Sequence, residues 1–144
     1  MPGIRHPLLI NGVPVVTPPA EIDVTTAEQL RVVLLDAGRH GHATVVVDMT
    51  RTRFCDSAGL AVLAGAHRRA LAQGGGLRLV LPAGGAVARL LSFTGLDCFI
   101  PGFGTLEEAL TAPPAAVIRP SRPRPPAGRR LARPSGLPRD GVSW

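Results

Sequence analysis

An aspartate and a serine stand side by side at positions 56 and 57, directly before a long apolar segment in the stretch TRFCDSAGLAVL (52–63). This pair fits three kinds of chemistry. The serine can be a nucleophile at a strand-to-helix turn, a helix N-cap, or a hydroxyl that accepts phosphate. The elements around the pair and its neighbouring residues must decide among them.

A serine nucleophile requires a general base within hydrogen-bond reach. The segment CDSAG departs from the Gly-x-Ser-x-Gly pattern only at Cys55. His67 lies ten residues further along the same predicted helix, about 15 Å along its axis. Three histidines lie upstream, and spacing ties no carboxylate to them: His6, His40 and His42. We therefore predict that the protein is not an enzyme.

The N-cap interpretation gives the Ser57 hydroxyl a free backbone N–H of the first helical turn as its partner. Asp56 then adds a negative charge at the positive helix end. Capping does not exclude a functional role, because the predicted turn follows a central strand, where sheets of this class present their sites.

The first half of the chain alternates apolar strand patterns with one helical pattern. VPVVT (13–17) predicts a strand, and PPAEID (18–23) predicts extended backbone. The capping-box pattern of residues 25–28, with Thr25 as N-cap, opens a helix that runs to about Ala37. The inward face of this helix is predicted to comprise Ala27, Leu30, Leu34 and Ala37. ATVVVDM (43–49) is a β-branched run typical of a strand buried on both faces.

The second half continues the alternation. A helix from Ser57 is ended by the three glycines at 74–76, with Leu60, Leu63, Ala64 and Leu71 at helical spacing. The elements predicted after it are a strand at 77–82, a helix at 85–95, a strand at 98–103 and a capped helix at 105–112. The pattern predicts a single α/β domain over 1–112, with a mixed sheet of about four to five strands and about four helices packed on it.

The charge is divided unevenly along the chain. Residues 1–112 carry nine arginines and nine carboxylates, whereas residues 113–144 carry seven arginines, one aspartate and eight prolines. We predict that 113–144 is a disordered basic tail. We expect no nucleic-acid binding beyond weak electrostatic contact through this tail, because aromatic stacking residues are scarce. The chain contains no lysine, which excludes lysine-based phosphate loops and Schiff-base chemistry.

The cysteines and histidines give no metal-binding pattern. Cys55 and Cys98 are far apart and are expected to be small buried core residues in a reducing compartment. His40-Gly41-His42 has no third ligand nearby. We predict no metal and no cofactor. The sequence shows neither a signal peptide nor a membrane-spanning run, and a cytoplasmic protein is expected.

The segment VVVDMTRTRFCDSAGLAVLAGAHRRA resembles the core of the STAS domain, the fold of bacterial anti-sigma factor antagonists. Three further stretches agree in order: PAEIDVTTAEQLR (19–31), the glycines before LRLVLP (77–82), and VARLLSFTGLDCFI (87–100). The resemblance covers about residues 8–112 and leaves the tail outside.

The resemblance implies a phosphorylation switch in bacterial transcription regulation. In this family the serine after the aspartate, here Ser57, is phosphorylated by an anti-sigma factor that is itself a kinase with a histidine-kinase-like ATPase fold. The unphosphorylated protein binds that factor and frees the sigma factor, phosphorylation ends the binding, and a phosphatase resets the switch. Asp48 and Asp56 match acidic positions near the acceptor, and Ala58 replaces a second serine found in many members.

The expected partner-binding surface therefore comprises Asp23, Asp56, Ser57, Ala58, Gly59, His67 and Arg68. His67 and Arg68 are expected on the solvated face of the helix after Ser57. An alternative is a STAS interaction module in another signalling or lipid-transport complex that is not phosphorylated.

Overall fold

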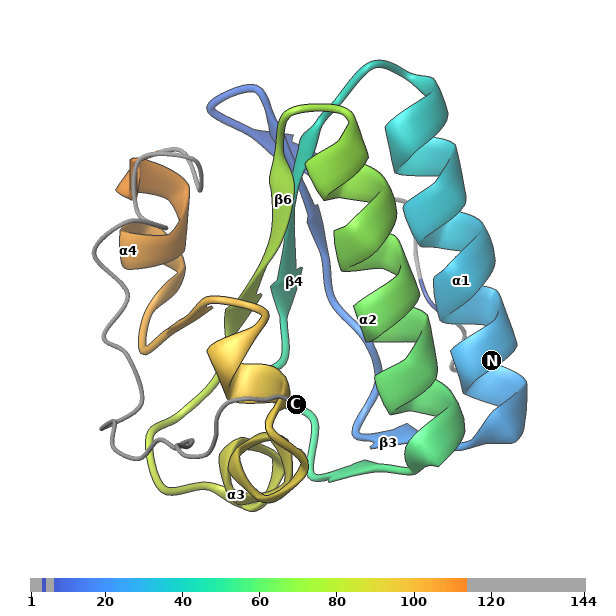
Figure 1. Cartoon of the computed structure of the whole chain (residues 1–144), viewed down its shortest axis with the longest axis vertical. Coiled ribbons are helices and arrows are strands. Elements are labelled where there is room, and N and C mark those ends of the chain that lie inside the picture. Colours follow the sequence, from blue (N-terminus) through green and yellow to red (C-terminus); the bar gives the residue numbers. More distant parts are fainter. Residues whose placement is uncertain (1–3, 5–6, 114–144) are drawn as a thin grey trace, which may run out of the picture.

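The computed structural model describes Ile4 and residues 7–113 (Figure 1). Its main sheet has the order β1-β2-β4-β6-β7. These strands are Leu8–Ile10, Val13–Val16, Thr44–Asp48, Gly76–Val80 and Gly102–Phe103. β1 is antiparallel to β2, and the remaining pairs are parallel. The predicted single α/β domain with a mixed sheet is confirmed.

Helices cover the two faces of the sheet unequally (Figure 1). α1 (Val24–Arg39) and α2 (Ser57–Ala72) lie side by side on one face, and α4 (Leu106–Thr111) covers the other. α3 (Ala86–Thr94) and the 3-10 helix η1 (Leu96–Cys98) lie at the end where α1 and α2 begin. This layering leaves the starts of α1 and α2 at one end of the molecule.

The β-branched run of β4 is buried on both faces, as its composition predicts. Val45 and Val47 pack in the larger core under α1 and α2, while Val46 belongs to the smaller core under α4. The predicted inward face of α1 is also confirmed, since its buried residues are Ala27, Leu30, Leu34 and Ala37. In α2 the buried residues are Gly59, Leu63, Ala66 and His67, whereas Leu71, at the same helical spacing as Leu63, is exposed.

Three short strands were not predicted, and β1 is the first of them. β1 and the predicted strand β2 form a hairpin around Asn11 and Gly12, which have φ angles of 54° and 79° as a two-residue type I′ turn requires. That Asn-Gly pair was the available signal. β3 (Glu21–Ile22) and β5 (Phe54–Cys55) form a separate parallel pair, and two-residue strands are too short to show a period.

The start of α1 corrects the predicted cap. Asp23, and not Thr25, is the N-cap, and Thr26 completes the capping box with it. Asp23 lies two residues earlier in extended backbone, so the helix begins at Val24 and the free N–H that the cap satisfies is that of Thr26. At α4 the predicted cap is confirmed, because the Thr105 hydroxyl accepts from the Glu108 N–H at 3.1 Å.

Glycines make the connection between α2 and β6 possible. Gly74 has a φ of +89°. A Cβ on Gly75 would lie 2.0 Å from the Ala43 carbonyl oxygen, so this position admits no side chain without movement of the backbone. The close approach sets β6 beside β4 from its first residue.

Toward the C-terminus the chain differs from prediction in two places. Residues 96–98 form η1, so the strand expected over 98–103 is reduced to β7. Cys98 is exposed, and only Cys55 is buried as expected of both cysteines. Cys98 lies in the short connection between α3 and β7 and not in a core strand.

The predicted domain boundary near residue 112 follows α4. Arg78, only 7% exposed on β6, donates to the carbonyl oxygens of Ala109 at 2.7 Å and Pro113 at 2.9 Å. These bonds hold the end of α4 against the sheet. The predicted disordered tail lies outside the described residues from 114 onward.

Candidate functional site

The β3–β5 pair brings the starts of α1 and α2 together. Ile22 stands beside Cys55 in this parallel pair, and the Asp56 N–H donates to the Ile22 carbonyl at 3.0 Å. Asp23 directly follows Ile22, and Asp56 directly follows Cys55. Two aspartates that begin two neighbouring helices therefore lie at the same end of the molecule, which Figure 1 shows at the β3 label.

The loop before Ser57 is tied to the extended segment before α1. The Arg53 N–H donates to the Ala20 carbonyl at 2.7 Å, and the Thr52 hydroxyl donates to the Pro19 carbonyl at 3.1 Å. At the end of β4, Asp48 accepts from the Thr50 N–H and hydroxyl at 3.1 and 2.8 Å. These bonds fix the path of the chain between β4 and β5.

Asp56 is the N-cap of α2, and the prediction of Ser57 in that role is wrong. An Asp56 carboxylate oxygen accepts from the Gly59 N–H at 3.1 Å. Ser57 is the first helical residue and is exposed. Its hydroxyl makes no hydrogen bond to any residue in the described part of the chain. Because Asp56 already satisfies the helix start, the Ser57 hydroxyl is available for other chemistry.

Asp23 caps α1 in the same way. Its carboxylate accepts from the Thr26 N–H at 3.0 Å, and its own N–H donates to the Thr26 hydroxyl at 2.8 Å. The bond from the Thr26 N–H, helped by the Thr26 hydroxyl, lowers the pKa of the Asp23 carboxyl. Asp23 is thus held as an anion at this end of the helix pair.

Gly59 and His67 are not surface contacts, contrary to expectation. Gly59 is buried, and a Cβ there would lie 2.6 Å from the Cys55 sulfur and 2.8 Å from Ile22 Cγ2. Gly59 therefore allows α2 to pack closely on the β3–β5 pair.

His67 is 2% exposed, and its Nδ1 accepts from the Leu77 N–H at 3.0 Å. Its ring also makes an edge contact with Phe99 at 4.6 Å between centroids. Burial lowers the pKa of His67. Arg68 is exposed and Ala58 is half-buried, so these two expected contact residues remain accessible.

Two exposed apolar side chains near Ser57 were missed by sequence reasoning. Val24, the first residue of α1, is 70% exposed, and Phe54 in β5 is 52% exposed. Phe54 alternates with the buried Cys55, which was the one available signal. Exposed apolar groups beside charged ones are typical of protein-binding surfaces.

The described residues around Ser57 supply no partner for nucleophilic catalysis. His67 is buried with Nδ1 engaged, and His40 and His42 lie at or beyond the opposite end of α1, which is about 24 Å long. Burial, with a smaller contribution from the Asp56 charge, raises the pKa of the Cys55 thiol to about 11. That thiol stays protonated near neutral pH. Among the described residues no cluster of three metal-ligating side chains occurs.

The sheet order, with β1 antiparallel and the other pairs parallel, and the helix pair on one face define a mixed α/β domain. The family model for the STAS domain matches residues 9–109, and the chain belongs to that family. The resemblance seen in the sequence is thereby confirmed.

Solved structures of anti-sigma factor antagonists are similar to this chain. One from Mycobacterium paratuberculosis is 30% identical with a TM-score of 0.65, over 76% of this chain and 89% of the other. SpoIIAA in its unphosphorylated form is 22% identical with a TM-score of 0.62, over 83% of this chain and 96% of the other. No curated protein sequence matches the chain. Within the described residues, every helix is too short or too polar to cross a membrane.

Proposed function

We propose that this protein is an anti-sigma factor antagonist controlled by phosphorylation of Ser57. The unphosphorylated form binds an anti-sigma factor that is also a serine kinase, and the sigma factor is released. Phosphorylation of Ser57 ends that binding, and a phosphatase restores it. The observation that carries the proposal is the exposed Ser57 hydroxyl, which has no hydrogen-bond partner within Ile4 and residues 7–113, at a helix start that Asp56 already caps.

The surface around Ser57 suits a protein partner. The apolar side chains of Val24 and Phe54 are exposed beside the carboxylates of Asp23 and Asp56. A docking protein can bury the apolar groups and place cationic groups against the carboxylates. A kinase that docks here has the acceptor hydroxyl within its contact area.

A phosphate on Ser57 is compatible with the folded domain. The first N–H groups of α2 and the helix dipole favour an anion at this position, and the hydroxyl already projects into solvent. Modification therefore leaves the fold intact and acts on the complex.

The same phosphate opposes the complex. It adds about −1.5 to −2 charges beside Asp56, in a contact area that must lose water on binding. A loss of about 4 kcal/mol in binding, roughly a thousandfold in Kd, is the expected scale. Similar structures support this proposal, since SpoIIAA is known in a phosphorylated as well as an unphosphorylated form.

The test uses the anti-sigma factor kinase with ATP, followed by mass mapping of the modified peptide and calorimetric titration. We expect one phosphate, on Ser57, and loss of binding after it is added. Ser57→Asp should weaken binding at least tenfold, because it adds one charge to the contact area. Thr111→Asp is the control, since Thr111 is an exposed helical hydroxyl residue on α4, which covers the opposite face of the sheet from α1 and α2.

Phosphate on another residue, or normal binding by Ser57→Asp, would contradict the proposal. The second of these results, together with an unmodified Ser57, would favour a STAS interaction module in a different complex.

A further inference from the structure

A cavity of about 160 Å³ lies between the C-terminal halves of α1 and α2, away from Ser57. Arg69 lies twelve positions after Ser57, about 18 Å further along the axis of α2. The cavity is therefore distinct from the surface assigned to the protein partner.

The floor of the cavity is apolar. Leu34 of α1, Val45 of β4 and Leu77 of β6 form it, and each is at most 5% exposed. Engineered cavities of about this size in other proteins accommodate a benzene ring. The floor thus suits a compact apolar group of that size.

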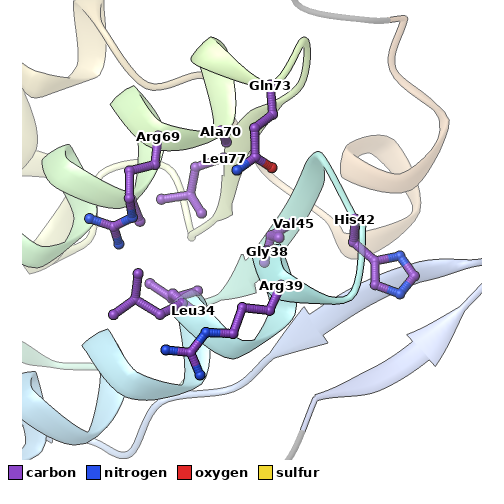
Figure 2. Close-up of a pocket in the computed structure, with 11 residues that line it drawn as sticks. Leu34, Gly38, Arg39, His42, Val45, Arg69, Ala70, Gln73 and Leu77 are labelled. Carbon is purple, nitrogen blue, oxygen red and sulfur yellow. The ribbon is translucent and has the colours of Figure 1, made fainter.

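The rim of the cavity is basic and polar. Arg39 of α1 and Arg69 of α2 line it with Gln73, and all three are exposed. Figure 2 shows the guanidinium groups of Arg39 and Arg69 on opposite walls with Leu34 between them, and the Gln73 amide directed into the gap. His42 also lines the cavity, but its ring points away from these groups.

The side chains of Arg39, Arg69 and Gln73 have no hydrogen-bond or ion-pair partner among the described residues. The lining contains no carboxylate. Both arginines lie in the last turn of their helices, where they face the negative ends of the helix dipoles. Those two ends amount to about −1 charge together, so two guanidinium groups leave a positive excess of about one charge.

We propose that this cavity binds a small organic anion, a carboxylate carried on a compact apolar group. The apolar group occupies the floor of Leu34, Val45 and Leu77. The carboxylate accepts hydrogen bonds from the guanidinium groups at the rim and from the Gln73 amide. Arginine favours carboxylates because its planar fork of N–H donors matches their two oxygens.

Benzoate is a suitable test compound, and benzyl alcohol is its neutral counterpart. We expect saturable NMR shifts at Leu34, Val45 and Leu77 with benzoate. Benzyl alcohol should bind about tenfold more weakly, because a charge-assisted hydrogen bond is lost. Inorganic phosphate, which has a charge but no apolar group, should bind more weakly than benzoate too.

Variants separate this site from general attraction to arginine. Arg39→Gln and Arg69→Gln should each weaken benzoate binding several-fold, whereas Arg68→Gln should not, because Arg68 is exposed on the same helix but outside the lining. Gly38→Leu should abolish binding without loss of charge. Gly38 borders the cavity, and a Cβ there meets no atom within 4 Å.

Equal affinity for benzoate and benzyl alcohol, an equal effect of Arg68→Gln and Arg69→Gln, or unsaturable shifts spread over the surface would each overturn the proposal. Because Gly38, Arg39 and Arg69 lie outside the expected partner-binding surface, failure here leaves the phosphorylation test unaffected.

Discussion

The two ends of the α1–α2 pair satisfy their polar groups in different ways. At the N-terminal end, Asp23 and Asp56 accept from backbone N–H groups of their own helices, and packing around Gly59 is close. At the C-terminal end, Arg39 and Arg69 have no side-chain partner among the described residues, and a cavity remains between the helices. The same two helices therefore present a well-packed acidic end and a loosely packed basic end.

This difference explains why the two ends suit different ligands. A surface whose caps are internally bonded keeps its shape when one group, the Ser57 hydroxyl, is modified. An end whose exposed donors have no protein partner among the described residues, over an apolar floor, can exchange water for hydrogen bonds to a small molecule and bury apolar area. Gly59 allows close packing at the N-terminal end of α2, and Gly75 allows it just after the C-terminal end. Replacement of these two glycines gives the largest expected losses of stability.

Gly75→Ala should destabilise the protein most, by about 3 kcal/mol. The added Cβ would lie 2.0 Å from the backbone oxygen of Ala43, and backbone cannot rotate away as a side chain can. Urea denaturation measures the loss. Gly38→Ala is the control and should be neutral or stabilising, because a Cβ there meets nothing within 4 Å. Equal stability of the two variants would contradict the proposed close approach at Gly75.

Gly59→Ala should cost about 2 kcal/mol, less than Gly75→Ala, because its Cβ meets side-chain atoms of Cys55 and Ile22 that can shift. Cys55→Ala in the same chain should restore part of the loss by removing the sulfur. Gly65→Ala, in the same helix, is the control and should stabilise by up to about 1 kcal/mol. Thermal unfolding compares the three, and the absence of rescue by Cys55→Ala would count against this packing.

Asp56→Ala should cost about 1 kcal/mol of stability, since it removes the N-cap of α2. Ser57→Ala should change the free energy of unfolding by only a few tenths of a kcal/mol, because the Ser57 hydroxyl caps nothing. Chemical denaturation of both variants decides which residue is the cap. A larger loss for Ser57→Ala would reverse the assignment.

His67 should contribute a small pH dependence. Burial places its folded pKa below the unfolded value of 6.5, so the unfolded chain binds more protons as the pH falls. Its contribution is complete above about pH 6.5 and is lost progressively as the pH falls from there toward the lowered folded pKa. His67→Gln, whose amide oxygen can accept from the Leu77 N–H, should flatten this part of the stability profile. An unchanged slope in His67→Gln would show that another group titrates.

Much of the fold could be predicted from the sequence, because periodic patterns are local. The inward face of α1 and the doubly buried β4 followed directly from spacing and β-branching. The short β3–β5 pair could not be predicted, since two residues carry no period and their pairing depends on segments about 30 residues apart. The sequence located the candidate site through Ser57. It assigned the N-cap of α2 to Ser57, one residue after the observed cap, Asp56.

The sequence by itself determined the alternation of strands and helices, the division of charge between the domain and the tail, and the position of Ser57 at a helix start. The tertiary structure alone decided which side chains from distant segments come into contact. His67 continues the helical spacing of Leu60, Leu63 and Ala64, so the sequence pattern already placed it on the inward face; the structure adds its partner, the Leu77 N–H of β6. Arg39 and Arg69 are 30 residues apart, and they share one cavity only because α1 and α2 pack side by side on the same sheet.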